Sequence, residues 1–318
     1  MDLQQAQLEV ICMKLHAEYK NHKLLGRGAF NISYLLVTDK GKFVLRIGNS
    51  THTKKLLKEY IILKKLDGQF GPKVFFIDDS LKIIPRIYII EELLEGVHPE
   101  EVFSEELLLA MGEWYSRLHK YKSSTLPEYM NDSSQYSLIR SFEWVTIDFY
   151  ENKEVLDEEF RKKINLFYAQ AFTIIRKEDK LFSKRKELSL NQGDPSRSNI
   201  FYTNGIVKLV DWEFTKYELR EWDLAFFVWS RDLTQEQKKL FLEAAKYPKT
   251  KEAEKEFEII YLLHCLMMLS WMVERLNQVE KDEVDPQQSN STKEEMMEGI
   301  QESLALLEKS MEIIKEIF

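Results

Sequence analysis

The sequence predicts an α+β fold in which a small antiparallel β-sheet lobe with one helix precedes a larger, mostly helical lobe that contains a β-hairpin. Three observations carry this prediction. Short apolar runs separated by turn residues follow one another through residues 23–90, as expected of a small sheet. From residue 104 onward, most apolar residues recur at helical spacing. Within this helical part, Asn204-Gly205 separates two apolar runs, and that dipeptide is the strongest short-range signal for a β-hairpin.

The composition favours a soluble protein of the cytoplasm. The chain has 318 residues, of which 44% are hydrophobic and 31% are charged, so it can bury a large core. Its formal charge of −8 lacks the basic surplus typical of nucleic-acid or anionic-membrane binding. Cys12 and Cys265 form neither a disulfide framework nor a zinc-binding motif, and the apolar run Ile259–Val273 is too short to cross a bilayer. We therefore expect no nucleic-acid partner and no membrane association; the oligomeric state stays open.

The first lobe is predicted for residues 1–94 and carries the sheet. Its internal helix, Thr53–Leu66, places Leu56 and Glu59 on its inner side and lysines such as Lys55 on its outer side. The elements predicted for this lobe, in chain order, are a helix within Met1–Tyr19, strands Ile32–Thr38 and Phe43–Ile47, the internal helix, and a second hairpin from Pro72–Ile77 and Ile83–Ile90.

The second lobe is predicted for residues 95–318 and is mostly helical. Thr234 and Gln237 match the capping box that starts a helix, and the polar stretch Asn277–Lys293 predicts a loop before the last helix. The helices predicted for this lobe, in chain order, lie within Ser104–Tyr121, Tyr136–Tyr150 and Lys153–Lys177, then from Thr234 onward, within Lys251–Asn277, and up to Phe318.

The second-lobe hairpin brings four oxygen-bearing side chains together. Antiparallel pairing through the Asn-Gly turn makes Asn199, before the first strand, a neighbour of Asp211, after the second. Asp194 precedes Asn199 in the same loop, and Glu213 follows Asp211. Such oxygen ligands suit Mg²⁺, which takes one or two carboxylates together with substrate phosphates. The sequence therefore predicts a Mg²⁺ site at this end of the hairpin, with Asp194 left over as a base.

Each of these side chains also fits a structural role. Asp194 could be a turn carboxylate beside Pro195, Asn199 a cap at a strand edge, and the acidic residues after the hairpin solvated charges. The first lobe favours the chemical interpretation. Gly26-x-Gly28 enters a strand, like the glycine turn that covers phosphates in kinases, whereas a dinucleotide-binding fingerprint opens a helix.

Two charges in apolar surroundings give a further prediction. Arg46 interrupts the apolar run of a predicted strand, and Glu59 lies among the inward residues of the helix. Buried charges are costly unless they are paired. An Arg46–Glu59 ion pair would place Arg46 against nucleotide phosphates. In the alternative, which strand alternation also permits, Arg46 faces solvent and Glu59 faces water.

Several short motifs match one known family. They are Gly193-Asp194-x4-Asn199, Asp211-x-Glu213, Asp223-Leu224-Ala225 and the Leu118-His119 pair that ends a predicted helix. These motifs resemble those of the aminoglycoside phosphotransferase and choline kinase family, and the resemblance extends over roughly Lys23–Trp229. It implies the two-lobed protein-kinase-like fold and an enzyme that transfers the γ-phosphoryl group of ATP to a hydroxyl of a small molecule.

The resemblance also implies a role for each candidate residue. Asp194 would be the catalytic base, Asn199 and Asp211 would hold Mg²⁺, Glu213 would hold a second ion, and Asp223 would brace the catalytic loop. The ATP-binding residues implied are Gly26, Gly28, Asn31 and Ser33 over the phosphates, Arg46 with Glu59 beside them, and the backbone from Glu92 to Leu94 at the adenine.

Two positions depart from the common pattern. Gln192 stands where the family has histidine, and Arg46 stands where many kinases have lysine, although arginine occurs there in choline-kinase-like members. Either cation can neutralise phosphate charge. Gln192 keeps open the alternative of a nucleotide-binding sensor or scaffold protein that has lost turnover. A protein kinase is disfavoured, because the His-Arg-Asp, Asp-Phe-Gly and Ala-Pro-Glu motifs are missing.

The sequence leaves the acceptor open among an aminoglycoside, a choline-like amine and another hydroxylated metabolite. The acidic balance mildly favours a cationic acceptor and equally fits an ordinary soluble surface. The tryptophans could either cage a quaternary ammonium by cation–π attraction or pack in the core; they are Trp114, Trp144, Trp212, Trp222, Trp229 and Trp271.

Overall fold

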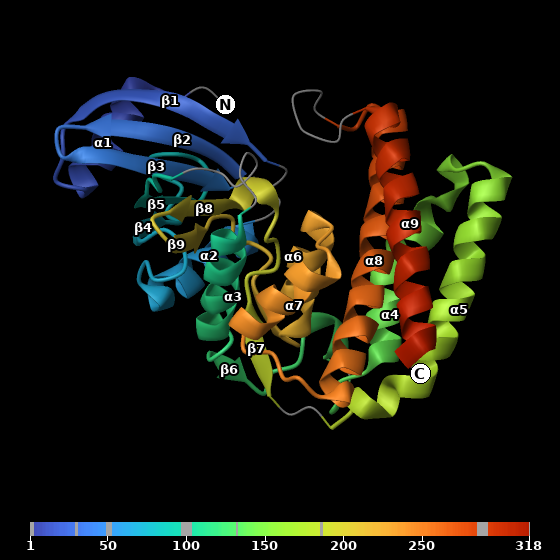
Figure 1. The fold of residues 1–318 in the computed structure, drawn as a ribbon. Coiled ribbons are helices and arrows are strands. Elements are labelled where there is room, and N and C mark those ends of the chain that lie inside the picture. Colours follow the sequence, from blue (N-terminus) through green and yellow to red (C-terminus); the bar gives the residue numbers. More distant parts are fainter. Residues whose placement is uncertain are drawn as a thin grey trace. The chain divides into compact units, whose positions relative to one another are not determined.

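A computed structural model gives the fold for residues 3–28, 31–48, 53–96, 104–131, 133–184, 187–284 and 292–317. The chain divides into two compact units, which Figure 1 traces. Unit 1 comprises Met1–Ala110 with Gln192–Thr215, and unit 2 comprises Met111–Asn191 with Lys216–Phe318. The predicted domain division at residues 94 and 95 stays a prediction.

Unit 1 is built on a five-stranded antiparallel sheet (Figure 1). Its strands are β1 (Tyr19–Arg27), β2 (Asn31–Thr38), β3 (Gly41–Gly48), β4 (Val74–Asp78) and β5 (Tyr88–Glu92), in the order β1-β2-β3-β5-β4. Both predicted hairpins of this lobe are confirmed. However, β5 begins five residues later than predicted, because Pro85 has no N–H to donate to a neighbouring strand.

The two faces of this sheet differ in chemistry. One face packs against α1 (Gln5–Lys14), which confirms the predicted amino-terminal helix. The core on this face contains Leu8, Ile11, Cys12, Tyr34, Leu36, Leu45, Ile47, Tyr88 and Ile90. Because successive strand residues point to opposite faces, Asn31, Ser33, Arg46 and Glu91 lie on the other face. We call this second face the polar face.

Two further elements of unit 1 follow their predictions. The helix α2 has the predicted bounds, Thr53–Leu66, and it buries Leu56 and Glu59. The strands β8 (Ile200–Thr203) and β9 (Ile206–Leu209) form the predicted hairpin. Its turn residues Asn204 and Gly205 have φ angles of 50° and 81°, and a two-residue hairpin turn of this type requires positive values at both positions.

Unit 2 is mostly helical. Its helices are α4 (Leu138–Asn152), α5 (Glu158–Phe182), α6 (Glu221–Arg231), α7 (Gln235–Ala244), α8 (Lys251–Glu280) and α9 (Lys293–Ile317). The helix α3 (Glu105–Leu118) starts among residues of unit 1 and ends among those of unit 2. A small sheet has the strand order β10-β7-β6, from Lys216–Glu218, Leu188–Asn191 and Lys122–Ser123.

The predicted helices of unit 2 are confirmed with shifted ends. The helix α5 begins at Glu158 and not at Lys153, because the Asp157 side chain accepts a hydrogen bond from the Phe160 N–H and caps the helix there. Thr234 caps α7 with the predicted capping box. The helix α8 continues to Glu280, so the predicted loop begins later, and its residues 285–291 lie outside the described part of the chain.

The helix α8 contains the apolar run Ile259–Val273, which by itself is too short to cross a bilayer. By length and composition the whole helix could cross a membrane, but 72% of its most apolar window is buried inside the molecule. Its main packing partners are α4, α6 and α9. It therefore has the properties of a core helix of unit 2.

Two buried histidines make unit 2 sensitive to acid. The His264 ring lies between Phe226 and Trp229, with centroid distances of 4.6 and 5.5 Å, and neither ring nitrogen has a hydrogen-bond partner among the described residues. Burial lowers the pKa of His264 to about 3. Burial, together with the charges of Arg220 and Lys122, lowers the pKa of His119 to about 3.

We expect His119 and His264 each to make a contribution that lowers the free energy of unfolding as the pH decreases from 6.5 towards 3. Below pH 6.5 the unfolded chain takes up protons at these histidines that the folded chain excludes, and each should remove about 2 kcal/mol by pH 5. Urea denaturation at pH 7 and pH 5 measures this loss. His264→Phe should reduce the loss by about 2 kcal/mol, and an unchanged pH dependence in this variant would contradict the expectation.

Candidate functional site

The loop after β7 holds the Asp194 carboxylate by hydrogen bonds. Asn199 Nδ2 donates to Asp194 Oδ2 at 2.9 Å, and the Ser196 N–H donates to Asp194 Oδ1 at 3.3 Å. Asp194 and Asn199, two of the four side chains predicted to converge here, are therefore in direct contact, and the Val210 N–H, next to Asp211, donates to the Asn199 carbonyl oxygen at 2.9 Å. Burial, and then the charge of Asp211, raises the pKa of Asp194 to about 6. The two aspartates are thus close enough for their charges to repel.

Gln192 ties this loop to the segment that carries Asp211. Its side-chain Nε2 donates to the carbonyl oxygens of Val210 at 3.1 Å and Asp211 at 2.7 Å. Its Oε1 accepts the N–H of Asp194 at 2.8 Å. One neutral amide therefore fixes the backbone of both aspartates, and this explains how glutamine can serve where the family has histidine.

Backbone conformation restricts the same loop. Gly193 has a φ of +94°, and a Cβ there would lie 2.6 Å from the Phe214 carbonyl oxygen, so this close approach requires glycine. Asp211 has a φ of 60°, which is uncommon for a residue with a side chain. The bond from Gln192 to the Asp211 carbonyl helps to hold this conformation.

Arg46 joins three segments of unit 1. Its NH1 donates to Glu59 Oε1 of α2, and its NH2 donates to Asp211 Oδ1 at 2.9 Å. Glu59 Oε1 also accepts the Trp212 N–H at 3.1 Å. The side chains of Arg46 and Glu59 are 6% and 0% exposed. The predicted ion pair is present, and the solvent-facing alternative is wrong. Burial lowers the pKa of Arg46, but its acidic neighbours raise it above the ordinary value, so the guanidinium stays charged.

Glu213 is buried against the polar face. Its Oε2 accepts a hydrogen bond from Asn31 Nδ2 at 3.0 Å, so the structure brings together these two candidates from distant parts of the chain. Burial, and then the charge of Asp211, raises the pKa of Glu213 to about 8.

The prediction that Lys55 lies on the outer side of α2 is wrong. Lys55 is half-buried, and its Nζ lies 4.5 Å from the Phe214 ring centroid. Burial lowers the pKa of Lys55, against the opposing charges of Glu213 and Asp211. Helical periodicity separates the core side of a helix from its other sides, but it does not reveal that the segment around Phe214 covers one flank of α2.

Asn199 and Asp211 have oxygen atoms suited to a cation. Asn199 uses its Nδ2 on Asp194, which leaves its Oδ1 for other contacts, and the Asp211 side chain is 36% exposed. Across the described residues, no group of three or more His, Cys, Asp and Glu side chains could hold a metal ion. This limited ligand set fits Mg²⁺, which takes few protein ligands and completes its shell with water and substrate phosphates.

The glycine candidates, Gly26 and Gly28, lie where β1 ends and the chain turns into β2. Gly26 pairs with Ser33 across β1 and β2, and the Gly28 N–H donates to the Asn31 carbonyl oxygen at 2.9 Å. A Cβ at Gly26 would meet nothing within 4 Å. Packing within the described chain therefore does not explain the glycine at position 26.

Glu92 and Leu94 lie at the end of β5. The Glu92 Oε2 accepts a hydrogen bond from Lys208 Nζ at 3.0 Å and another from the Lys73 N–H at 3.0 Å. The Glu92 side chain therefore links β5 to the β8–β9 hairpin within unit 1. Leu94 follows the strand and is partly exposed.

Asp223 lies at the start of α6 in unit 2 and is 1% exposed. Its N–H donates to Asn191 Oδ1 at 3.1 Å, and Asn191 directly precedes Gln192 in the chain. This contact fits the bracing role that the resemblance implies for Asp223.

Trp144 and Trp222 do form part of an aromatic cage, but the protein fills it with its own cation. Lys216 Nζ lies 4.3 Å from the Trp144 ring centroid, 5.7 Å from that of Trp222 and 5.3 Å from that of Tyr129. A Glu218 carboxylate oxygen lies 3.7 Å from the same ammonium. These two tryptophans therefore bind Lys216 inside unit 2 and leave no room for an acceptor's ammonium group.

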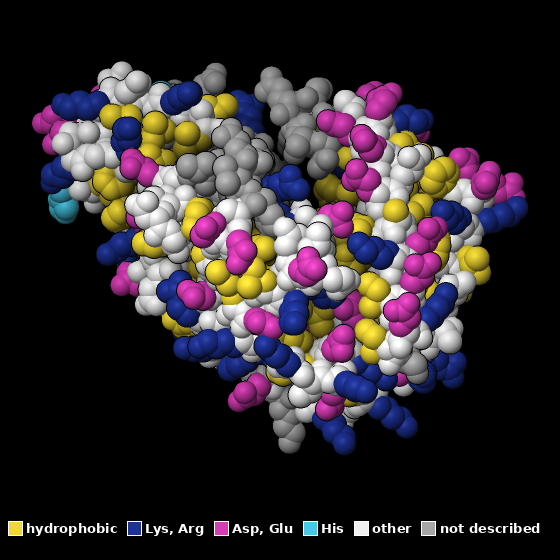
Figure 2. All heavy atoms as spheres, viewed as in Figure 1, with side chains coloured by type: hydrophobic (Ala, Val, Ile, Leu, Met, Phe, Trp, Pro, Cys, Tyr) yellow, Lys and Arg dark blue, Asp and Glu magenta, His cyan; other side chains and the backbone are white. Residues whose placement is uncertain are grey.

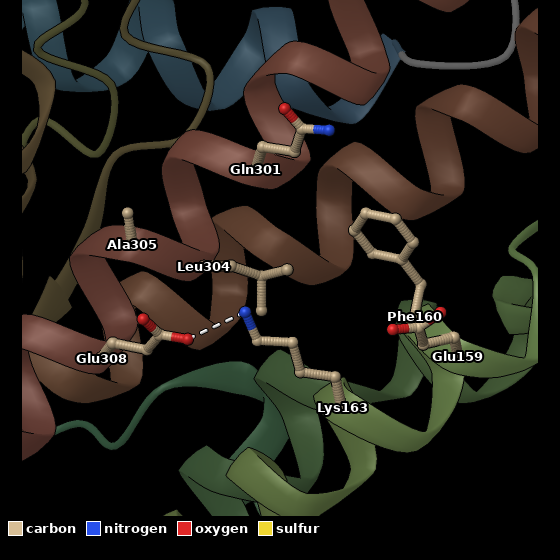
Figure 3. Close-up of a pocket in the computed structure, with 7 residues that line it drawn as sticks. All are labelled: Glu159, Phe160, Lys163, Gln301, Leu304, Ala305 and Glu308. Carbon is tan, nitrogen blue, oxygen red and sulfur yellow. Dashed lines mark ion pairs between the residues drawn. The ribbon is translucent and has the colours of Figure 1, made fainter.

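A separate hollow lies between α5 and α9 in unit 2. Figure 3 shows Lys163 of α5 reaching Glu308 of α9, with an N–O distance of 2.9 Å, beside the apolar side chains of Phe160 and Leu304. The hollow has a volume of about 280 Å³ and lacks the carboxylate–amide pair of the Asp194 loop. This hollow is therefore not part of the candidate site.

On the face shown in Figure 2, acidic and basic side chains are interspersed.

Comparisons with known proteins agree on one family. The phosphotransferase enzyme family matches residues 22–257. The protein LicA homolog of Metamycoplasma hominis is 24% identical over 192 residues, which are 58% of this chain and 70% of that protein. A choline kinase structure from Cryptosporidium parvum has a TM-score of 0.68 at 14% identity, covering 99% of this chain and 98% of that chain. A spectinomycin phosphotransferase complex with ADP and spectinomycin has a TM-score of 0.63 at 14% identity, covering 98% and 99%. These structural likenesses confirm the predicted protein-kinase-like fold.

Glu59→Gln should destabilise unit 1 by about 3 kcal/mol, because it leaves the buried charge of Arg46 without its main partner. The matched control is Glu18→Gln, since Glu18 pairs with Lys20 on the surface and its side chain is 76% exposed. The control should change stability by less than about 1 kcal/mol. Urea denaturation compares the two variants, and equal stabilities would show that the Arg46–Glu59 pair does not hold this part of the fold together.

Proposed function

Since the chain belongs to the phosphotransferase enzyme family, we propose that it transfers the γ-phosphoryl group of Mg²⁺-bound ATP to a hydroxyl group of a small molecule. Asp194 is the proposed base, Asn199 and Asp211 the proposed metal ligands, and the polar face of unit 1 the proposed nucleotide site. The environment of Asp194 carries this proposal.

Asp194 has the properties that a base for alcohol phosphorylation needs. Its carboxylate is oriented by Asn199 and Ser196, and its backbone is fixed by Gln192. It would accept the proton of the acceptor hydroxyl. In a loose transition state much of the bond to the leaving oxygen has broken before this proton must depart, so an ordinary carboxylate is a sufficient base. A protein that only bound nucleotide would have no use for an aspartate held in this way.

Arg46 would neutralise charge on the phosphates. Its guanidinium remains charged because Glu59 and Asp211 surround it, and this planar group can bind phosphate oxygens at two points. Asn31 and Ser33 lie on the same face of the sheet. The open space beside Gly26 would allow phosphates to approach the backbone.

The remaining nucleotide contacts are proposed at the edges of this face. Gly28, between β1 and β2, would lie over the phosphates together with Gly26. Glu59 would act through Arg46 and not touch the nucleotide itself. The backbone from Glu92 to Leu94 would contact the adenine, because the side chain of Glu92 is already bound to Lys208.

The metal ligands would be Asn199 and Asp211, with Glu213 at a second ion. When bound, Mg²⁺ would neutralise charge on the transferred phosphoryl group. Arg46 donates a hydrogen bond to the Asp211 side chain, and Gln192 donates one to the Asp211 carbonyl oxygen. These contacts support Asp211 as an oriented metal ligand.

The proposed acceptors are aminoglycosides, choline-like amines and other small hydroxylated molecules. Similar solved structures include a choline kinase and a spectinomycin phosphotransferase, and both names describe phosphoryl transfer to a small alcohol. The acidic balance of 53 Asp and Glu against 45 Lys and Arg is compatible with a cationic acceptor.

Asp194→Asn should lower phosphoryl transfer by at least about 100-fold, because the amide cannot accept the hydroxyl proton. The affinity for Mg²⁺-ATP should stay within about threefold of the wild-type value, since Asp194 is not a proposed phosphate contact. The matched control is Asp67→Asn, because Asp67 is exposed, belongs to the same unit, and has a φ of 44° that asparagine also adopts. A variant at position 194 that retains full turnover would refute the proposed role.

ADP release in the presence of Mg²⁺-ATP and a panel of acceptors tests the function itself. The panel contains aminoglycosides, choline, ethanolamine, sugars and nucleosides. Stimulation by one acceptor, lost in Asp194→Asn, would establish a small-molecule kinase and its substrate class. Nucleotide binding without stimulation by any of them would favour the sensor alternative, and the absence of both would contradict the proposal.

A further inference from the structure

Glu91 is a buried acidic residue on the polar face that the proposed chemistry does not use. It pairs with Val44 across β3 and β5, and Val44 is two residues from Arg46 on the same strand. Side chains at paired positions and at alternate positions of a strand lie on the same face of the sheet. Glu91 therefore lies on the face of Arg46, Ser33 and Asn31.

One oxygen of the buried Glu91 carboxyl group lacks a hydrogen-bond partner among the described residues. The residue is 3% exposed, and the oxygen without a partner is Oε2. Arg46 acts on Glu91 through its charge, but it donates its hydrogen bonds to Glu59 and Asp211. A buried polar atom without a partner is unfavourable, and such a group in a native protein points to a missing ligand or to water.

The position of Glu91 in the chain indicates which ligand would meet it. Glu91 directly precedes the segment Glu92 to Leu94, which is the proposed contact of the nucleotide base. The Glu92 side chain is occupied by Lys208 and by the Lys73 N–H. Among the described residues from Glu91 to Leu94, the Glu91 carboxyl group is thus the polar side-chain group that could contact a nucleotide base.

We propose that Glu91 binds the base of the nucleotide and makes the enzyme prefer ATP to GTP. This inference rests on the proposed function. The carboxyl group would accept a hydrogen bond from the 6-amino group of adenine and donate one to the neighbouring ring nitrogen, N1.

The chemistry of the buried carboxyl favours adenine over guanine. Burial raises the pKa of Glu91 to about 8 against the opposing charge of Arg46, so the group is mostly protonated at neutral pH and offers one donor and one acceptor. The 6-amino group of adenine offers the complementary donor, and its N1 offers the complementary acceptor. Guanine has a 6-oxo group, and its N1–H and 2-amino groups are two adjacent donors, which would suit an ionised carboxylate instead.

Calorimetric titration of the full chain with three Mg²⁺-bound nucleotides tests this inference: ATP, GTP, and purine riboside triphosphate, which lacks the 6-amino group. ATP should bind about tenfold more tightly than the other two, as expected for the loss of one or two hydrogen bonds. Glu91→Gln keeps one donor and one acceptor in the same shape, and should keep the preference within about threefold. Glu91→Leu removes both groups and should bring the three affinities together. Glu95→Gln, at an exposed position in the same segment, is the control and should change none of them.

Three results would overturn the inference. They are equal binding of ATP and purine riboside triphosphate by the wild-type chain, a preference for GTP, and an ATP preference that survives in Glu91→Leu. The first two use the wild-type protein, so they decide the question even if Glu91→Leu fails to fold, which its thermal unfolding curve would show. A wild-type chain that binds none of the nucleotides would instead contradict the proposed function.

Discussion

The contact of Arg46 with Glu59 and Asp211 is the constraint on which the chemistry of unit 1 depends. It links a strand of the sheet, the helix α2 and the segment after the β8–β9 hairpin. Because the guanidinium of Arg46 is charged and both Arg46 and Glu59 are buried, the arrangement is stable only while Arg46 keeps its acidic partners. The fold therefore holds the guanidinium of Arg46 beside Asp211 at a defined position.

A second constraint, made of neutral groups, fixes the loop of Asp194. Gln192 bonds to the backbone of Asp194 and of Asp211, and Gly193 permits the close approach to Phe214. The Gln192 amide does not titrate, so its own hydrogen bonds to Asp194 and Asp211 do not change across the pH range in which a histidine would change its charge. This substitution thus agrees with a working site, and it offers no support for a protein that has lost turnover.

Much of the fold was predictable because it is encoded by local signals. Asn204-Gly205 specifies its hairpin through positive φ angles. The pairing of Arg46 with Glu59 is predictable because burying either charge without a partner has a high free-energy cost. The start of β5 differs from the prediction because the apolar run extends through Pro85, whose missing N–H prevents regular strand pairing there. The family resemblance anticipated the fold, and the roles of Asp194, the metal ligands and the nucleotide contacts stay predictions.

Other features could not be predicted, because they depend on which segments pack together. Lys55 lies beside Phe214 only because a distant segment covers one side of α2. Similarly, Trp144 and Trp222 surround Lys216 across three elements of unit 2, so an apparent acceptor cage is an internal contact. The isolation of Glu91 depends on where Arg46 directs its bonds, which the sequence does not specify.

The most direct test of this account is the affinity for ATP with and without Mg²⁺, measured by calorimetry for the wild-type chain and for Asp211→Asn. If Arg46 and Gln192 hold Asp211 as a metal ligand, Mg²⁺ should strengthen ATP binding by at least about tenfold in the wild-type chain. This gain should largely disappear in Asp211→Asn, while ATP alone still binds. An equal gain in both proteins, or no gain in the wild-type chain, would contradict the account.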